Sequence, residues 1–385
     1  MHAKIFLHKL LGFSIHKKRL QLLEDVITVV VKMKQLSLTA LGRAFENRTQ
    51  ERSGIQKMNR MLGNVYFQEE NKEIYRTIIE QVVGSKQTPE IIVDWSKLPN
   101  IEEYMLRASL SAEGRAITLY EEVHPKKKEG NRSVHSVFLE NLKKLLRPDC
   151  KPIIVTDAGF KNPWFKKVLS LNWDYVGRVR GKVTYESNEG YKACKDLHQK
   201  AGKIPNYLGE KKLSKKNSLL TQFYLVRQNL KGRIKKAKNG KRSQNKDSKN
   251  YGQSYREPWL LVSSLSGYSV AKKVTAIYKR RMTIEEAFRD TKSSQYGFSM
   301  DENKTRNRER LIVWLVIAAL ASLWAWIVGY AAEKRGLHSQ FQANTIRDRR
   351  VLSFFYLGCQ VIRKKIKIPI DLRQIQFTQE VFING

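Results

Sequence analysis

Residues 91–94 read IIVD, and residues 152–157 read PIIVTD. Each stretch is a short apolar run that ends in an aspartate, and such a run between turn-forming residues is typical of a buried strand. If the two strands are parallel neighbours, Asp94 and Asp157 emerge at one edge of a sheet, where open α/β folds bind ligands. For either aspartate alone, a turn or helix cap after a strand is the commoner role.

The pair of aspartates suggests a divalent cation. Two carboxylates that lie close together repel each other unless a cation lies between them. Their hard oxygen atoms favour Mg²⁺ or Mn²⁺. The sequence therefore raises the hypothesis of a metal site at Asp94 and Asp157, provided that the fold brings the two strands together.

The pattern around these runs indicates an α/β domain with a mixed sheet. Its apolar spacing changes between the period of a strand and the period of a helix. The expected elements are strands at 103–111 and 115–123, a helix at 134–146, a helix at 163–171 and a strand at 173–183. Residues 185–265 then interrupt the order, with strand-like pieces on both sides of a basic tract at 231–249. This tract is either a solubilising segment or a phosphate-binding arm.

Both ends of the chain are expected to be helical. Residues 1–85 have helical spacing, and two short helices at 36–43 and 55–64 resemble a helix-turn-helix DNA reader. The alternative is a plain helical bundle with a solvated basic face. From Val270 to about Lys364 the chain again has helical spacing.

One apolar segment, at 311–330, reads LIVWLVIAALASLWAWIVGY and is about long enough to span a bilayer. Arginines and lysines flank it on both sides. Because no other segment of this kind occurs in the sequence, we interpret it as a helix buried in a large core rather than a membrane span.

The charge balance indicates a polyanionic partner. The chain has 72 Lys and Arg against 36 Asp and Glu, a formal net charge of +36. Nucleic acid is the expected partner, with an anionic membrane surface or a ribosomal or architectural role as alternatives. Three widely spaced cysteines without a C-x-x-C pair suit a reducing compartment and make a zinc site improbable. The N-terminus has no pattern of a signal peptide.

Residues 278–292, YKRRMTIEEAFRDTK, predict a helix with one functional face. At helical spacing, the side chains of Tyr278, Arg281, Glu285 and Lys292 fall in a stripe about 60° wide, whereas Glu286 points away. One carboxylate among cationic groups suits a metal ligand beside phosphate-binding groups. The alternative is a solvent-facing surface held by i,i+4 ion pairs.

Together these stretches resemble the DDE transposases of the bacterial insertion-sequence-four family and, within it, the transposon-ten branch. The helix at 278–292 matches that family's Y-R-E-K signature at every spacing, and the resemblance covers nearly the whole chain. The other matching segments are Ile92–Ser96 and Val155–Phe160 around the two aspartates, Arg178–Gly181, Glu257–Trp259 and Phe341–Arg347.

The resemblance implies a ribonuclease H-like catalytic core with a β-rich insertion, flanked by α-helical N- and C-terminal regions. The implied domains are 1–85 for DNA-end binding, 86–330 for catalysis, with the insertion at about 185–265, and 331–385 for possible dimerisation. Asp94, Asp157 and Glu285 would hold two Mg²⁺ ions, for which Mn²⁺ would substitute. The implied DNA-binding residues are Tyr278, Arg281 and Lys292 at the terminal 5′ phosphate, Trp259 stacked on a flipped base, and Arg178 and Arg180 on phosphate.

The implied activity is cut-and-paste DNA transposition, by hydrolysis and strand transfer at the ends of an insertion sequence through a DNA hairpin. Its partners would be double-stranded DNA and a second copy of the chain in a synaptic complex, with no membrane. The expected location is the bacterial cytoplasm, in association with the nucleoid. The alternatives are a ribonuclease H-like nuclease without joining activity, an inactive DNA-binding repressor of transposition and a basic membrane protein.

Overall fold

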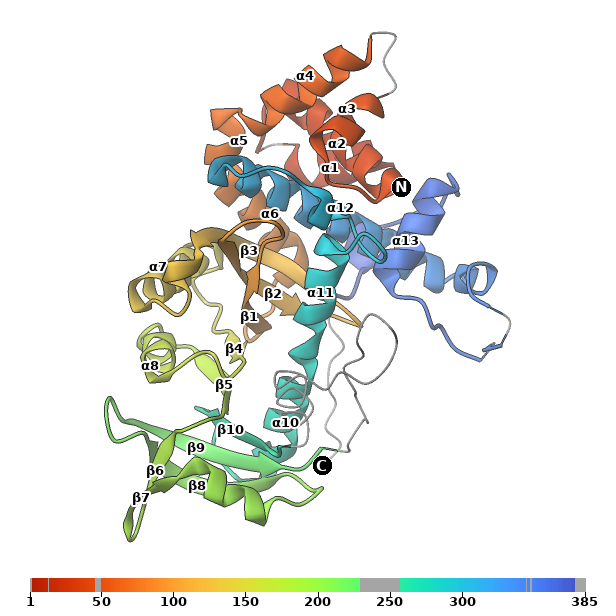
Figure 1. The fold of residues 1–385 in the computed structure, drawn as a ribbon. Coiled ribbons are helices and arrows are strands. Elements are labelled where there is room, and N and C mark those ends of the chain that lie inside the picture. Colours follow the sequence, from red (N-terminus) through yellow and green to blue (C-terminus); the bar gives the residue numbers. More distant parts are fainter. Residues whose placement is uncertain are drawn as a thin grey trace, which may run out of the picture. The chain divides into compact units, whose positions relative to one another are not determined.

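The computed structural model describes residues 2–12, 14–45, 50–228, 257–343, 345–346 and 348–377. These residues form a mixed α/β fold that divides into two compact units (Figure 1). The described residues of Met1–Cys150 and Met282–Phe382 form the first unit, and those of Lys151–Arg281 form the second. The basic tract at 231–249 lies outside the described residues.

The sheet of the first unit is an antiparallel meander in the order β3-β2-β1. Its strands are β1 (Glu90–Lys97), β2 (Glu103–Ser111) and β3 (Ala116–Pro125). The prediction for β2 is confirmed, and β3 begins one residue later than predicted. The prediction that the first strand ends at Asp94 is wrong, because β1 stays paired with β2 as far as Lys97 opposite Tyr104.

A different helix packs on each face of this sheet. Side chains alternate along a strand, so Asp94 and Ser96 lie on one face and Trp95 on the other. Helix α7 (Arg132–Leu145) covers the Trp95 face. Helix α11 (Met282–Lys292) covers the Asp94 face and contacts all three strands. The face that carries Asp94 is therefore the face under the helix that carries Glu285.

The described part of residues 1–85 contains six α-helices, which confirms the predicted helical content (Figure 1). They pack in the same compact unit as β1, β2 and β3. Their bounds are Ala3–Leu11 (α1), Lys17–Met33 (α2), Leu38–Arg43 (α3), Glu51–Leu62 (α4), Val65–Glu69 (α5) and Asn71–Val83 (α6).

Helices α3 and α4, the predicted DNA-reading pair, cross at two glycines. A Cβ atom at Gly42 would lie 2.5 Å from the Cα of Ile55, and one at Gly54 would lie 2.1 Å from the carbonyl oxygen of Gly42. Only glycine leaves room for this backbone contact. The close crossing fixes the geometry of the pair without large side chains.

The long apolar segment forms α12 (Arg308–Glu333), whose first turn is capped by the side chain of Asn307. Among the described residues it is the one helix long and apolar enough to span a bilayer, and 89% of its apolar window is buried inside the structure. It packs against α13 (Phe354–Arg363), α2 and β3. The expectation of a buried core helix agrees with this packing.

The second unit has a mixed sheet in the order β4-β5-β10-β9-β8-β6-β7, in which β4 and β5 are parallel and the other described pairs are antiparallel. Its helices include α8 (Asn162–Ser170) and α10 (Ala271–Arg280). The strands are Ile153–Thr156 (β4), Asp174–Val179 (β5), Thr184–Ser187 (β6), Gly190–Ala193 (β7), Asn206–Leu213 (β8), Leu219–Val226 (β9) and Trp259–Ser263 (β10).

Two predicted elements of this region are each divided in the structure. The strand expected at 173–183 ends at Val179, because the chain turns at Gly181, which has a φ of +79°. The prediction of a single helix at 278–292 is wrong, because the structure has two helices there. Helix α10 ends at Arg280 and α11 begins at Met282, and the N–H group of Arg281 donates to Tyr278 with the shorter i→i−3 spacing.

Candidate catalytic site

Asp94 is half-buried on β1, and its Oδ1 atom accepts a hydrogen bond of 2.9 Å from the backbone N–H of Trp95. Its register partner on β2 is Arg107. Glu285 is exposed on α11, while the half-buried Glu286 forms ion pairs with Arg115 and Arg289. The two neighbouring glutamates thus have different surroundings, as the helical spacing predicts.

Lys292 connects the helix that carries Glu285 to the strand that carries Asp94. Its Nζ atom donates to the hydroxyl of Ser96 and to the carbonyl oxygen of Lys97, both at 2.5 Å. Burial and, to a smaller extent, the positive charge of Arg107 lower the pKa of Lys292 to about 7, against the opposing effect of the Asp94 carboxylate. Of the predicted site residues, the structure therefore places Asp94, Glu285 and Lys292 on adjoining elements of one unit.

A second group of predicted site residues lies in the second unit. Asp157 follows β4 and accepts a 2.7 Å hydrogen bond from the N–H of Gly159. The ring of Trp259 packs edge-to-face on Tyr278, with centroids 5.0 Å apart. Burial raises the pKa of Tyr278, and the charges of Arg281 and Arg178 oppose that rise. Tyr278 is therefore the centre of a cationic and aromatic cluster in this unit.

The two arginines at the end of β5 differ in their partners. Arg180 forms an ion pair of 3.0 Å with Glu257. In Arg178, by contrast, the Nε and Nη2 atoms are buried and have no hydrogen-bond partner among the described residues. Burial also lowers the pKa of Arg178. A buried guanidinium with unused donors suits an anionic group better than one already paired with a carboxylate.

The donor chemistry of the predicted metal ligands fits Mg²⁺, because all three are carboxylates and none is deeply buried. Asp94 and Glu285 belong to the first unit and Asp157 to the second. Within the described parts of the chain, no three His, Cys, Asp or Glu side chains form a group of metal-ligand type. The convergence of the three carboxylates stays a prediction.

Sequence reasoning missed several side chains that surround Asp94. Trp95 donates its indole N–H to Nε2 of the buried His135 at 3.0 Å, on the α7 side of the sheet. Arg107, 2% exposed, pairs with Glu121 on β3. For Arg107 and Glu121, the one signal in the sequence was a charged residue at a position where the alternation of the strand points inward. Their partners depend on strand register, which no local pattern specifies.

His135 is expected to make the protein less stable in mild acid. Burial, together with the nearby charge of His124, lowers the pKa of His135 to about 4, from an ordinary value of about 6.5. The unfolded chain therefore binds more protons than the folded chain between these values, and the free energy of unfolding falls as pH falls through this window. We expect His135 to account for a loss of about 2 kcal/mol between pH 7 and pH 5.

Urea unfolding of the wild-type protein and of His135→Gln at both pH values measures this contribution. Glutamine keeps an acceptor for the indole N–H of Trp95 but does not titrate. The variant should lose less stability than the wild type between pH 7 and pH 5. Equal losses in the two proteins would show that His135 does not titrate in this way.

The chain matches the family model of a transposase DDE domain over residues 117–324. No curated protein matches it. Among solved structures, it is similar to a piggyBac transposase in a synaptic complex with hairpin DNA, determined by cryo-electron microscopy. The identity is 12% and the TM-score 0.39, over 97% of this chain and 80% of that one.

The family match includes Asp157, Glu285 and Lys292, and begins downstream of Asp94. It extends across the β-rich strands of the second unit and most of α12. Because the matched residues make up more than half of the chain, this protein belongs to the DDE transposase family.

Proposed function

We propose that this DDE transposase is a cut-and-paste enzyme of the insertion-sequence-four family, from its transposon-ten branch. It cleaves DNA at the ends of an insertion sequence and joins them to target DNA. The observation that carries the proposal is the contact between α11 and β1 through Lys292, because it brings the helix of Glu285 against the strand of Asp94. A family match and two acidic residues on adjoining elements support an enzyme that acts on phosphodiesters.

Asp94, Asp157 and Glu285 would hold two Mg²⁺ ions, and Mn²⁺ would substitute. When bound, such a pair activates the attacking oxygen and stabilises the leaving oxygen of an in-line displacement at phosphorus. All three residues would serve as oxygen ligands of these ions. Asp94 is partly fixed for this task because a backbone N–H already orients its Oδ1 atom.

The cluster around Tyr278 would bind the terminal 5′ phosphate. Arg178 offers two buried donors, and Arg281 lies beside the ring of Tyr278, with its guanidinium carbon 5.9 Å from the centroid. Lys292 and Arg180 are the further proposed phosphate contacts. Arg180 would have to give up its ion pair with Glu257 to bind a DNA phosphate. Charge-assisted hydrogen bonds of this kind are the strong ones.

Trp259 would stack on a flipped base while the DNA end forms a hairpin. Its half-buried indole packs edge-to-face against the ring of Tyr278. Base stacking on an aromatic ring is worth about 1–3 kcal/mol, which offsets the cost of unstacking the base. The two Asp-bearing strands with the intervening helices would form a ribonuclease H-like core, and the segment at about 185–265, from β6 to β10, would be its β-rich insertion.

The proposed partners are double-stranded DNA, as terminal inverted repeats and as target, and a second copy of the chain in a synaptic complex. The net charge of +36 supports a polyanionic partner. The burial of α12 supports an enzyme without a membrane span. The proposed location is the bacterial cytoplasm, in association with the nucleoid.

Purified protein with Mg²⁺ and labelled DNA that carries the element's own terminal repeats tests the function. The products are resolved on a denaturing gel, with EDTA as the control. Nicks, hairpins and joined strands are expected. Nicks without joined products would identify a nuclease instead, and binding without any cleavage would identify an inactive repressor.

A further inference from the structure

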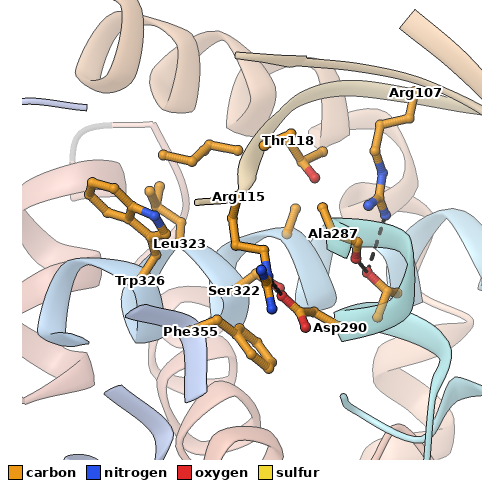
Figure 2. Close-up of a pocket in the computed structure, with 13 residues that line it drawn as sticks. Arg107, Arg115, Thr118, Ala287, Asp290, Ser322, Leu323, Trp326 and Phe355 are labelled. Carbon is orange, nitrogen blue, oxygen red and sulfur yellow. Dashed lines mark hydrogen bonds and ion pairs between the residues drawn. The ribbon is translucent and has the colours of Figure 1, made fainter. Parts of the chain in front are cut away.

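The hairpin of β2 and β3 reaches α11 through two arginines that no recognised motif includes. Arg107 is 2% exposed, and its Nη2 atom lies 3.4 Å from the hydroxyl of Thr291. Arg115, at the turn of the hairpin, donates to Asp290 at 2.6 Å. Figure 2 shows the guanidinium group of Arg115 pointing to Asp290 and that of Arg107 pointing to α11, where its partner is the next residue, Thr291.

Arg107 is itself held by a buried counterion. Glu121 lies opposite it on β3, and the two side chains are 2% and 1% exposed. The other carboxylate oxygen of Glu121 accepts from the hydroxyl of Tyr75 at 3.2 Å. The guanidinium of Arg107 also lies over the ring of Phe288, 4.9 Å from its centroid. Four elements, α6, β3, β2 and α11, are thus connected through one buried charge pair.

Stability alone is a weak reason for such a pair. Removing two charges from water costs free energy, and an apolar pair of similar volume is often equally stable or more stable. The side chains around Arg115 and Asp290 also fail to fill the space beside α11. A cavity there is lined by residues that include Ala287, Ser322, Leu323, Trp326 and Phe355 (Figure 2). On this side, the polar contacts of Arg107 and Arg115 are therefore among the interactions that hold the helix.

We propose that Arg107 and Arg115, with Thr291 and Asp290, form an arginine clamp that sets the rotation and register of α11 on the sheet. Arg107 is the register partner of Asp94. The clamp therefore orients Glu285 and Lys292 with respect to the strand that carries Asp94. Arg107 and Arg115 are positioning residues in this account, and the inference rests on the proposed function.

Paired substitutions test the clamp without leaving a buried charge alone. The variants are Arg107→Met with Glu121→Leu, and Arg115→Met with Asp290→Leu. Arg308→Gln with Glu103→Gln is the matched control, because that pair also begins on β2 but reaches α12. Each full-length protein is assayed for thermal unfolding, for Mn²⁺ binding by electron paramagnetic resonance and for cleavage of end DNA over a Mg²⁺ titration.

We expect the clamp variants to unfold at a temperature close to that of the wild type, yet to bind Mn²⁺ about 10- to 100-fold more weakly. Their cleavage should need correspondingly more Mg²⁺, while the control behaves like the wild type. If the two pairs have a purely structural role, the clamp variants will unfold at a lower temperature, but their folded fraction will need the same Mg²⁺ concentration as the wild type. That result would overturn the proposal.

If the paired variants fail to fold, Thr291→Val tests the same contact without removing a charge. It should raise the Mg²⁺ requirement roughly threefold to tenfold, and an unchanged requirement would overturn the clamp. Failure of the proposed function has a different signature. In that case, substitutions of Asp94 or Glu285 would change neither Mn²⁺ binding nor cleavage. The clamp would then have no metal-ligand carboxylates to orient.

Discussion

Glu285→Gln should reduce Mg²⁺-dependent cleavage of end DNA by about 1,000-fold or more, and Asp94→Asn and Asp157→Asn should do the same. Each change removes one charged ligand, and the loss of about 4 kcal/mol of transition-state stabilisation corresponds to that factor. Binding of end DNA, measured by gel shift, should stay within a few-fold of the wild type. The cationic residues that would bind phosphate are unchanged in these variants.

Glu286→Gln is the matched control for this series. Glu286 is the neighbour of Glu285 but forms ion pairs with Arg115 and Arg289. Its cleavage rate should remain within about threefold of the wild type, because half-exposed pairs contribute little. Full activity in Glu285→Gln together with loss in Glu286→Gln would show that the wrong glutamate has been assigned to the metal.

Gly358→Ala should destabilise the first unit by about 3 kcal/mol or more. A Cβ atom at Gly358, on α13, would lie 1.8 Å from the carbonyl oxygen of Ala325 on α12, which is backbone and cannot rotate away. The reciprocal contact exists as well, since a Cβ at Gly329 would lie 1.8 Å from the carbonyl oxygen of Phe354. The two helices must therefore separate, and overpacking of a core costs about 1–3 kcal/mol or more.

The direction of the stability change at Gly358 separates the effect of packing from that of helix propensity. In a helix interior, alanine is otherwise about 1 kcal/mol more favourable than glycine, so propensity alone predicts stabilisation. Guanidinium unfolding followed by circular dichroism measures the change. Gly63→Ala is the control, because a Cβ there would lie 3.4 Å from the end of the flexible Arg310 side chain and 3.7 Å, an ordinary contact distance, from the carbonyl oxygen of Asn59. A variant at Gly358 as stable as this control would show that α12 and α13 are not closely packed.

Much of the local structure follows from the spacing of apolar residues. The alternation at 103–111 gave the bounds of β2, and the helical spacing at 134–146 gave α7 within two residues. The length and apolarity of 311–330 gave the core of α12. These features depend on which side of an element is buried, and periodicity reports that directly.

Helical spacing predicted only part of the candidate site. Helical spacing separated Glu285 from Glu286, and the structure gives the two residues different surroundings. The same spacing predicted one continuous stripe from Tyr278 to Lys292, which the interruption at Arg281 divides between two units. A pattern of 15 residues does not contain the tertiary contacts that decide where a helix is broken.

By itself, the sequence determined the net charge of +36, the candidate acidic and basic residues, and the approximate bounds of several strands and helices around them. Only the tertiary structure decided that Lys292 contacts β1, that Arg107 pairs with Glu121 across two strands, and that α12 and α13 touch at glycines. The reason is physical. Local spacing sets the direction of each side chain, whereas contacts between residues far apart in the chain depend on strand register and helix packing, which are settled only when the core forms.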